Sequence, residues 1–285
     1  MKNIGILVGE DCDLPEKIIK DSGINIFPFV LEWEELKKQS EIYKTMRGPH
    51  KTSPKTSQPS PATFKELFEK CLEKYQDLIV LTVSSKFSGT YNSSVQARKM
   101  LDKKLQDRVH IVDSEVSSGA EALLVFEAIS MIDTDEKVEK IVEKLRRLSL
   151  RVNLLGAFED PQWLVAGGRL NPIKALLVKN LLKGGFRPIL TIKDGQIVVK
   201  KIQGNAHDSA EALFNQFKND FDNRSPDSEV NVVITHADFE DQANLLSKKL
   251  ANFSHSVKIK FIHEISPVIG SHLGPGALLL SWIVK

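Results

Sequence analysis

The sequence predicts an α/β protein with two domains, and three observations carry this prediction. In the first half, short runs rich in Val and Ile alternate with stretches of helical period, which is typical of parallel strands joined by helices. In the second half, Asp194-Gly195 lies between two β-rich runs and is a hairpin signal, so we expect a mixed or antiparallel sheet there. The length of 285 residues suits two domains of roughly 100–200 residues each. We therefore expect an N-terminal domain over 1–150, with a mostly parallel sheet flanked by helices, and a C-terminal domain over 151–285.

The first half contains three apolar runs that are typical of buried parallel strands: Ile4 to Val8, Leu78 to Val83 and Val109 to Val112. A helix is expected before the second run, because Ser60 can cap it and Pro61 suits its first turn. Apolar side chains then recur at helical spacing. Further helices are expected at 95–101, 120–132 and 136–148.

Residues 37–60 differ from the rest of the first half. This segment holds three prolines and many hydroxyl side chains but has no sustained hydrophobic period, so we expect a long loop. Loops of that length inside a compact domain are usually functional or disordered.

The second half carries further elements that fit a mixed sheet with helices. Val230 to Thr235 and Val257 to Ile262 are expected to be strands on either side of a helix capped by Asp238. The apolar residues between Ala210 and Phe221 predict another amphipathic helix. The domain boundary is expected near 149–156.

Composition and charge exclude several classes of protein. Lys and Arg number 39 and Asp and Glu 37, and a net charge of +2 argues against nucleic-acid binding. The two cysteines, Cys12 and Cys71, exclude a disulfide framework and fit a reducing compartment. The N-terminus lacks a secretory signal, and no apolar window approaches about 18 residues, so no stable membrane insertion is expected. We expect a cytoplasmic, soluble protein.

Three loops rich in hydroxyls or glycine stand out, at 55–61, 84–91 and 268–276, while signatures of common enzymes are absent. There is no phosphate-binding G-x-x-x-x-G-K-[ST] loop and no zinc-binding H-E-x-x-H, and Ser88 is not in a G-x-S-x-G turn. We expect no metal. Loops that lead into helix N-termini offer free N–H groups to an anion, so the three loops would suit one carboxylate or phosphate if they converge.

The motifs in and around these loops resemble those of the DegV family, in order and over nearly the whole length. They are Cys12-Asp-Leu-Pro15, Lys55-Thr-Ser-Gln-Pro-Ser-Pro61, Ser84-Ser-Lys-Phe-Ser-Gly-Thr-Tyr91, Val112-Asp-Ser114, Gly167-Gly-Arg169, Arg187-Pro-Ile-Leu190, Ile234-Thr-His-Ala-Asp238 and Pro267-Val-Ile-Gly-Ser-His-Leu-Gly-Pro-Gly276. The resemblance implies a non-catalytic protein without a cofactor that binds one long-chain fatty acid in a tunnel between its two domains. It also implies that the bound acid is presented to a fatty-acid kinase, which forms an acyl phosphate for phospholipid synthesis.

Carried over residue by residue, the resemblance assigns the fatty-acid carboxylate to Thr56, Ser88 and His272. Possible supporting residues in the same motifs are Ser57, Gly89 and Thr90. Arg169 would correspond to a residue used in docking the kinase.

The chain departs from the family pattern at several places, including Ser266-Pro267 and a shorter loop around 31–52, and two other functions stay open. Gly9-Glu10 replaces an Asp-Ser pair, and a basic stretch after the hairpin is replaced by Gln203, Asn205 and His207, which bears on kinase docking. The main alternative is an acyl hydrolase or acyltransferase with Ser88 as nucleophile and His272 as base. The other alternative is a sensor of an anion or phosphate ligand.

Overall fold

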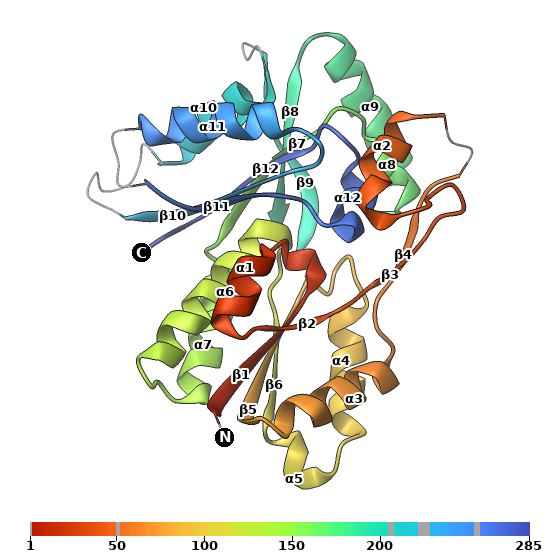
Figure 1. The fold of residues 1–285 in the computed structure, drawn as a ribbon. Coiled ribbons are helices and arrows are strands. Elements are labelled where there is room, and N and C mark those ends of the chain that lie inside the picture. Colours follow the sequence, from red (N-terminus) through yellow and green to blue (C-terminus); the bar gives the residue numbers. More distant parts are fainter. Residues whose placement is uncertain (1, 50–51, 205–207, 222–228, 254–256) are drawn as a thin grey trace. The chain divides into compact units, whose positions relative to one another are not determined.

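The computed structural model describes residues 2–49, 52–204, 208–221, 229–253 and 257–285 (Figure 1). The chain divides into two compact units. Unit 1 comprises Met1–Val30 and Ser57–Val152, and unit 2 comprises Leu31–Thr56 and Asn153–Lys285. The sequence-based boundary between 150 and 151 lies close to the change of unit after Val152, but the sequence did not indicate that 31–56 groups with the second unit.

Unit 1 is built on a four-stranded parallel sheet with the strand order β2-β1-β5-β6. Its strands are β1 (Lys2–Gly9), β2 (Asn25–Phe27), β5 (Tyr75–Thr82) and β6 (Val109–Asp113). The three strands predicted for this half are confirmed, whereas the short β2 at the sheet edge was missed.

The helices of unit 1 lie on both faces of this sheet, with α1, α6 and α7 on one side and α3 and α4 on the other (Figure 1). They are α1 (Glu16–Ser22), α3 (Pro61–Leu72), α4 (Thr90–Lys99), α5 (Lys103–Gln106), α6 (Ser118–Asp133) and α7 (Val138–Ser149), with a 3₁₀ turn η1 at Glu10–Cys12. The predicted cap of α3 is confirmed, because the Ser60 hydroxyl accepts a hydrogen bond from Thr63 N at 3.1 Å. The helix predicted at 95–101 begins earlier, at Thr90.

Unit 2 is built on a six-stranded mixed sheet with the order β11-β10-β12-β7-β8-β9. Its strands are β7 (Asn153–Ala157), β8 (Arg187–Lys193), β9 (Gln196–Gln203), β10 (Val230–His236), β11 (Val257–Glu264) and β12 (Leu278–Val284). Only β10 and β11 are parallel, and the other pairs are antiparallel. The predicted hairpin is β8–β9, whose two turn residues Asp194 and Gly195 both have positive φ, at 51° and 72°.

Two helices of unit 2 cover the sheet, and several of the others pack against one another. They are α2 (Ile42–Arg47), α8 (Gln162–Ala166), α9 (Pro172–Lys183), α10 (Ser209–Phe221), α11 (Glu240–Ala251) and α12 (Pro267–Leu273), with a 3₁₀ turn η2 at Gln39–Glu41. Helices α10 and α11 lie side by side against the sheet (Figure 1). Under them, Phe217 packs edge-on against Trp282 of β12, with 5.2 Å between ring centroids.

Three sequence predictions are corrected by these elements. Residues 37–60 are not one long loop, because they contain η2, α2 and the short strand β4 (Lys55–Ser57), which pairs with β3 (Val30–Glu32). The segment 268–276 is mostly α12 rather than a loop, and only its last three residues form a turn. Asp238 does not cap α11, whose N-cap is Phe239, because the Asp238 carboxylate accepts a hydrogen bond from Arg47 Nε at 2.6 Å.

Helix α2 escaped prediction because its order depends on a distant partner. The Tyr43 hydroxyl donates a hydrogen bond to the carbonyl of Ile265 at 2.6 Å, across 222 residues of sequence. The ring lies against Gly270, where an added Cβ would come within 2.2 Å of the hydroxyl oxygen. A helix of 6 residues shows no measurable period in sequence, and residues 50 and 51 beyond it lie outside the described residues.

Among the described residues, no helix combines the length and the apolar character needed to cross a bilayer.

Unit 1 buries a group of acidic side chains that the sequence analysis did not single out as a group. Asp11 and Asp13 follow β1 and are 1% and 3% exposed, and Glu121 of α6 is fully buried. Burial and the neighbouring Asp13 carboxylate raise the pKa of Asp11 to about 8. Burial, together with the charges of Asp11 and Asp113, raises the pKa of Glu121 well above its usual range.

Replacing Asp11 is expected to change how stability depends on pH. The folded-state pKa of Asp11 lies above its unfolded value, so the folded protein holds a proton that the unfolded chain loses above about pH 4. The free energy of unfolding should therefore fall as pH rises from about 4 to 8, by on the order of 2–5 kcal/mol, and Asp11→Asn should remove that fall. Urea unfolding at pH 5 and pH 8 measures it. The exposed Asp107→Asn is the control, and an equal pH dependence in both variants would contradict the prediction.

Candidate functional site

Thr56 and His272 are brought together within unit 2, although 216 residues separate them in sequence. Thr56 is the middle residue of β4, and His272 lies in the last turn of α12. The Thr56 hydroxyl and His272 Nε2 are 2.8 Å apart, which is hydrogen-bonding distance. Two of the three loops that the sequence analysis proposed for an anion therefore meet at one point.

The local sequence explains why α12 places His272 in this position. Pro267 occupies the first helical turn, where its missing N–H costs nothing, and the helix ends at Gly274, whose φ of 79° favours glycine. A Cβ at Gly274 would come within 2.0 Å of Trp163 Cδ1 in α8. Glycine at this position therefore lets the end of α12 pack directly against α8.

Arg169 lies near the His272 ring and changes its protonation. Burial, and secondly the positive charge of Arg169, lower the pKa of His272 to about 3. The imidazole is therefore neutral at physiological pH. The guanidinium is itself half-buried, its pKa is lowered by burial, and its Nη1 donates a hydrogen bond to the carbonyl of Gly167.

Ser88, Gly89 and Thr90 form a second polar group, which belongs to unit 1. The Ser88 and Thr90 hydroxyls are 2.7 Å apart, and the Thr90 backbone N–H donates to the Ser88 hydroxyl oxygen at 3.3 Å. Gly89 is the N-cap of α4, and a Cβ there would come within 2.7 Å of Gln58 Nε2. The backbone N–H groups at the start of α4 favour an anion at this place.

The remaining residues named from the sequence have separate positions. Ser57 ends β4 and is exposed, while Thr90 is fully buried. Gln203 ends β9, whereas Asn205 and His207 lie outside the described residues. The predicted carboxylate ligands thus fall into two sets: Thr56 and His272 in unit 2, and Ser88 in unit 1.

Sequence reasoning missed two contributors to the unit 2 set. It placed Arg169 on a docking surface and did not connect its charge with His272. It also missed Gly167, whose backbone lies against the imidazole. The available signal was the Gly-Gly pair directly before Arg169, because paired glycines mark a turn that neighbouring groups approach closely.

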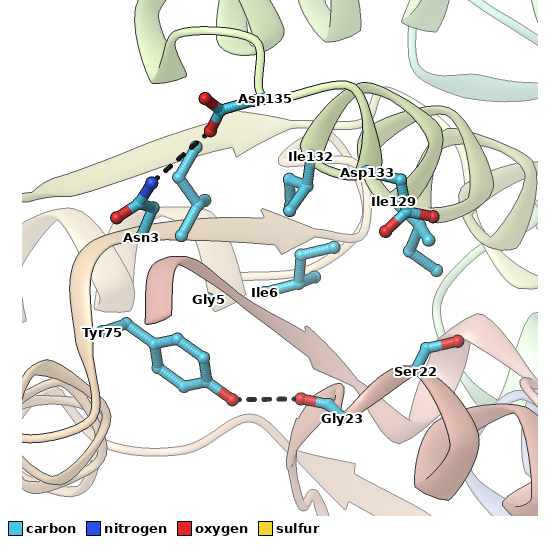
Figure 2. A pocket seen from close by; sticks show the side chains of 11 residues that line it. Asn3, Gly5, Ile6, Ser22, Gly23, Tyr75, Ile129, Ile132, Asp133 and Asp135 are labelled. Carbon is cyan, nitrogen blue, oxygen red and sulfur yellow. Dashed lines mark hydrogen bonds between the residues drawn. The ribbon is translucent and has the colours of Figure 1, made fainter. Parts of the chain in front are cut away.

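Each unit also has a cavity that none of the predicted ligand-binding residues lines. The cavity of unit 1 has a volume of about 330 Å³, and its lining includes Ile6, Ile129 and Ile132 (Figure 2). On its rim, Asn3 Nδ2 lies 3.5 Å from Asp135 Oδ1. The cavity of unit 2 has a volume of about 440 Å³ and lies along α8 and α9.

Comparison with known proteins gives consistent matches. The sequence model of the DegV family, described as "Uncharacterised protein, DegV family", matches residues 3–285. A Thermotoga maritima protein called fatty acid-binding protein is 32% identical over 289 residues, 96% of each chain. A DegV domain-containing protein of Caldanaerobacter subterraneus is 31% identical over 97% of each chain. A solved Thermotoga maritima structure, described as revealing fatty acid binding function, has 28% identity and a TM-score of 0.82 over 100% of both chains. These matches confirm the resemblance read from the motifs and the predicted α/β fold.

The His272 imidazole is expected to stay neutral from pH 8 down to about pH 4. Its folded-state pKa of about 3 lies below the unfolded value of 6.5, so the unfolded chain takes up the proton first as pH falls. The free energy of unfolding should therefore decrease between about pH 6.5 and pH 3, and less so in His272→Asn. Nitrogen-15 NMR of the lipid-free protein follows the ring directly, and a ring that titrates near pH 6.5 would contradict the prediction.

Proposed function

Because the chain belongs to the DegV family, we propose that it binds one long-chain fatty acid without chemical turnover, its carboxylate held by Thr56, Ser88 and His272. The observation that carries the proposal is the hydrogen bond between Thr56 and His272. It brings two of the predicted ligands, which are distant in sequence, to one place, where both can act on the same anion. The relative and the solved structure that are described as binding fatty acids support the same ligand class.

The acyl chain provides the binding energy, and the carboxylate sets the requirement for polar groups. Removing methylene groups from water gains up to about 0.8 kcal/mol each, so a 16-carbon acid gains roughly 10 kcal/mol before the costs of association. A desolvated carboxylate, in contrast, is costly unless it accepts hydrogen bonds or meets a positive charge. The site must therefore present donors at the position where the carboxylate lies.

The unit 2 residues can supply such donors. When neutral His272 donates its Nε2–H to Thr56, the hydroxyl proton of Thr56 is free to point at a carboxylate oxygen. His272 then helps to hold the carboxylate through Thr56, because the single N–H of the neutral ring is already used. The half-buried Arg169 beside the ring adds a positive potential that favours an anion. In the proposal, the Ser88 hydroxyl donates to the same carboxylate, and Ser57, Gly89 and Thr90 support the two hydroxyls.

Thr56→Val and Ser88→Ala are each expected to weaken palmitate binding by about tenfold, because each removes one hydrogen bond to a charged group. Displacement of a fluorescent fatty acid from the lipid-free protein measures the change in Kd. The exposed Thr134→Val removes a hydroxyl outside the proposed site and should leave Kd unchanged.

If both hydroxyls bind one carboxylate, the double variant should lose less than the sum of the two single losses. Additive losses would contradict a shared carboxylate. A wild-type protein that ignores palmitate would contradict the proposed function, and equal competition by acetate or phosphate would favour an anion sensor.

The geometry does not favour the alternative of a serine-nucleophile enzyme. Burial lowers the pKa of His272 to about 3, and so weak a base does not remove a proton from a serine hydroxyl efficiently near pH 7. The hydroxyl neighbour of Ser88 within unit 1 is Thr90, which is not a base. Binding without turnover is therefore the function that these residues support best.

The partner in this proposal is a fatty-acid kinase that phosphorylates the bound acid, docking at Arg169 and the adjoining helix α9. Three apolar side chains of α9 are exposed, namely Ile173 at 79%, Leu176 at 61% and Leu177 at 61%. Such a group is unusual on a protein surface unless a partner covers it. From 161 to 193 the chain has basic residues and no Asp or Glu, so an apolar partner surface with acidic residues would complement it.

Leu176→Glu is expected to lower acyl phosphate formation by a DegV-dependent fatty-acid kinase at least tenfold, because it places a charge in the apolar contact. Palmitate binding should stay unchanged, so the two assays separate docking from ligand binding. Leu150→Glu, at a leucine that is 72% exposed in unit 1, is the matched control. Equal kinase rates for the two variants would contradict docking at α9.

A further inference from the structure

We infer that Gly167 is a positioning residue for the anion site: its missing side chain lets the His272 ring lie against the 167–169 turn, with Nδ1 facing that turn and Nε2 donating to Thr56. The inference rests on the proposed fatty-acid site, of which it names a further component. Gly167 would touch no ligand and would act through His272.

The space around the His272 ring leaves no room for a side chain at position 167. A Cβ added at Gly167 would come within 2.3 Å of His272 Nδ1, and within 3.2 Å and 3.3 Å of the Cε1 and Cγ atoms of the same ring. Real Cβ atoms essentially never lie within 3.0 Å of a neighbour, so the ring and a methyl group cannot both occupy these positions. The ring would have to move, and the 2.8 Å distance from Nε2 to the Thr56 hydroxyl would change with it.

The backbone conformation of Gly167 does not by itself require glycine. Gly167 has φ −77° and ψ −5°, which any L-residue adopts without strain. Its neighbour Gly168 is the opposite case, with φ 73° and nothing within 4 Å of an added Cβ. The turn therefore needs Gly168 for its shape and Gly167 for its contact with the ring.

The surroundings of the His272 ring also indicate which of its two nitrogens carries the hydrogen. Nδ1 is buried and has no hydrogen-bond partner among the described residues. It faces the turn that carries Arg169, whose guanidinium is bonded to the Gly167 carbonyl. A positive charge on that side favours a lone pair on Nδ1 over an N–H, which leaves the hydrogen on Nε2. The lowered pKa of His272 agrees with a neutral ring in this position.

The consequence is a defined direction of hydrogen bonding. Nε2–H donates to the Thr56 oxygen, so the Thr56 hydroxyl donates its own hydrogen to the ligand. The site then selects an acceptor such as an ionised carboxylate, and binding needs no proton uptake by His272. A ligand group that only donates, such as a primary ammonium, would leave the Thr56 hydroxyl hydrogen without an acceptor.

The test is Gly167→Ala, read by long-range proton–nitrogen NMR of the imidazole and by palmitate displacement. Wild type should show hydrogen on Nε2, and Gly167→Ala should change the ring signals and raise the Kd for palmitate about tenfold, the loss of about one hydrogen bond. Gly168→Ala is the control, because it strains the same turn without touching the ring. It should leave the tautomer unchanged.

A double-variant cycle separates positioning from a general structural effect. In a His272→Ala background, Gly167→Ala should change the Kd less than twofold, because no ring remains to be displaced. An equal loss in both backgrounds, or unchanged ring signals and Kd in Gly167→Ala, would overturn the inference. The ring signals need no ligand, so they test the positioning even if wild type fails to bind palmitate, a result that would instead contradict the proposed function.

Discussion

Helices α8 and α12 approach each other through two glycines, and the unit 2 part of the candidate site depends on that approach. Gly274 at the end of α12 lets the helix pack on Trp163, and Gly167 at the end of α8 lets the His272 ring lie against the backbone. At either position, a Cβ atom would overlap the neighbouring ring. The ring is thereby held at hydrogen-bonding distance from Thr56, on a strand that the chain reaches more than 200 residues earlier.

Electrostatics follow from the same packing. Burial against α8 and the nearby guanidinium of Arg169 keep the imidazole uncharged, so the pair acts through hydrogen bonds while Arg169 supplies the positive potential. The neutral ring also separates binding from catalysis, because a ring that does not accept protons near neutral pH is a poor general base. Desolvation and the nearby cation therefore support the proposed role in binding over the alternative of a hydrolase.

Much of the fold could be predicted from sequence, because the signals involved are local. The apolar runs, the Ser60 cap and the Asp194-Gly195 turn all act within a few residues, and each appears where it was expected. Helix α2 and the grouping of 31–56 with unit 2 could not be predicted, because they depend on long-range contacts such as the Tyr43 hydroxyl with Ile265. Among the proposed site residues, motif resemblance singled out Thr56 and His272, but it did not predict their contact. The effect of Arg169 and Gly167 on the ring is likewise a property of packing, which hydrophobic periodicity does not encode.

Native and denaturing mass spectrometry of the purified protein, with the released small molecule identified, would show directly whether the protein carries a fatty acid. If the proposed function is right, the native mass exceeds the denatured mass by one long-chain fatty acid. The retained fraction should also be smaller in Thr56→Val than in wild type. A wild-type mass that shows no ligand, and that stays unchanged after incubation with fatty acids, would contradict the proposed function.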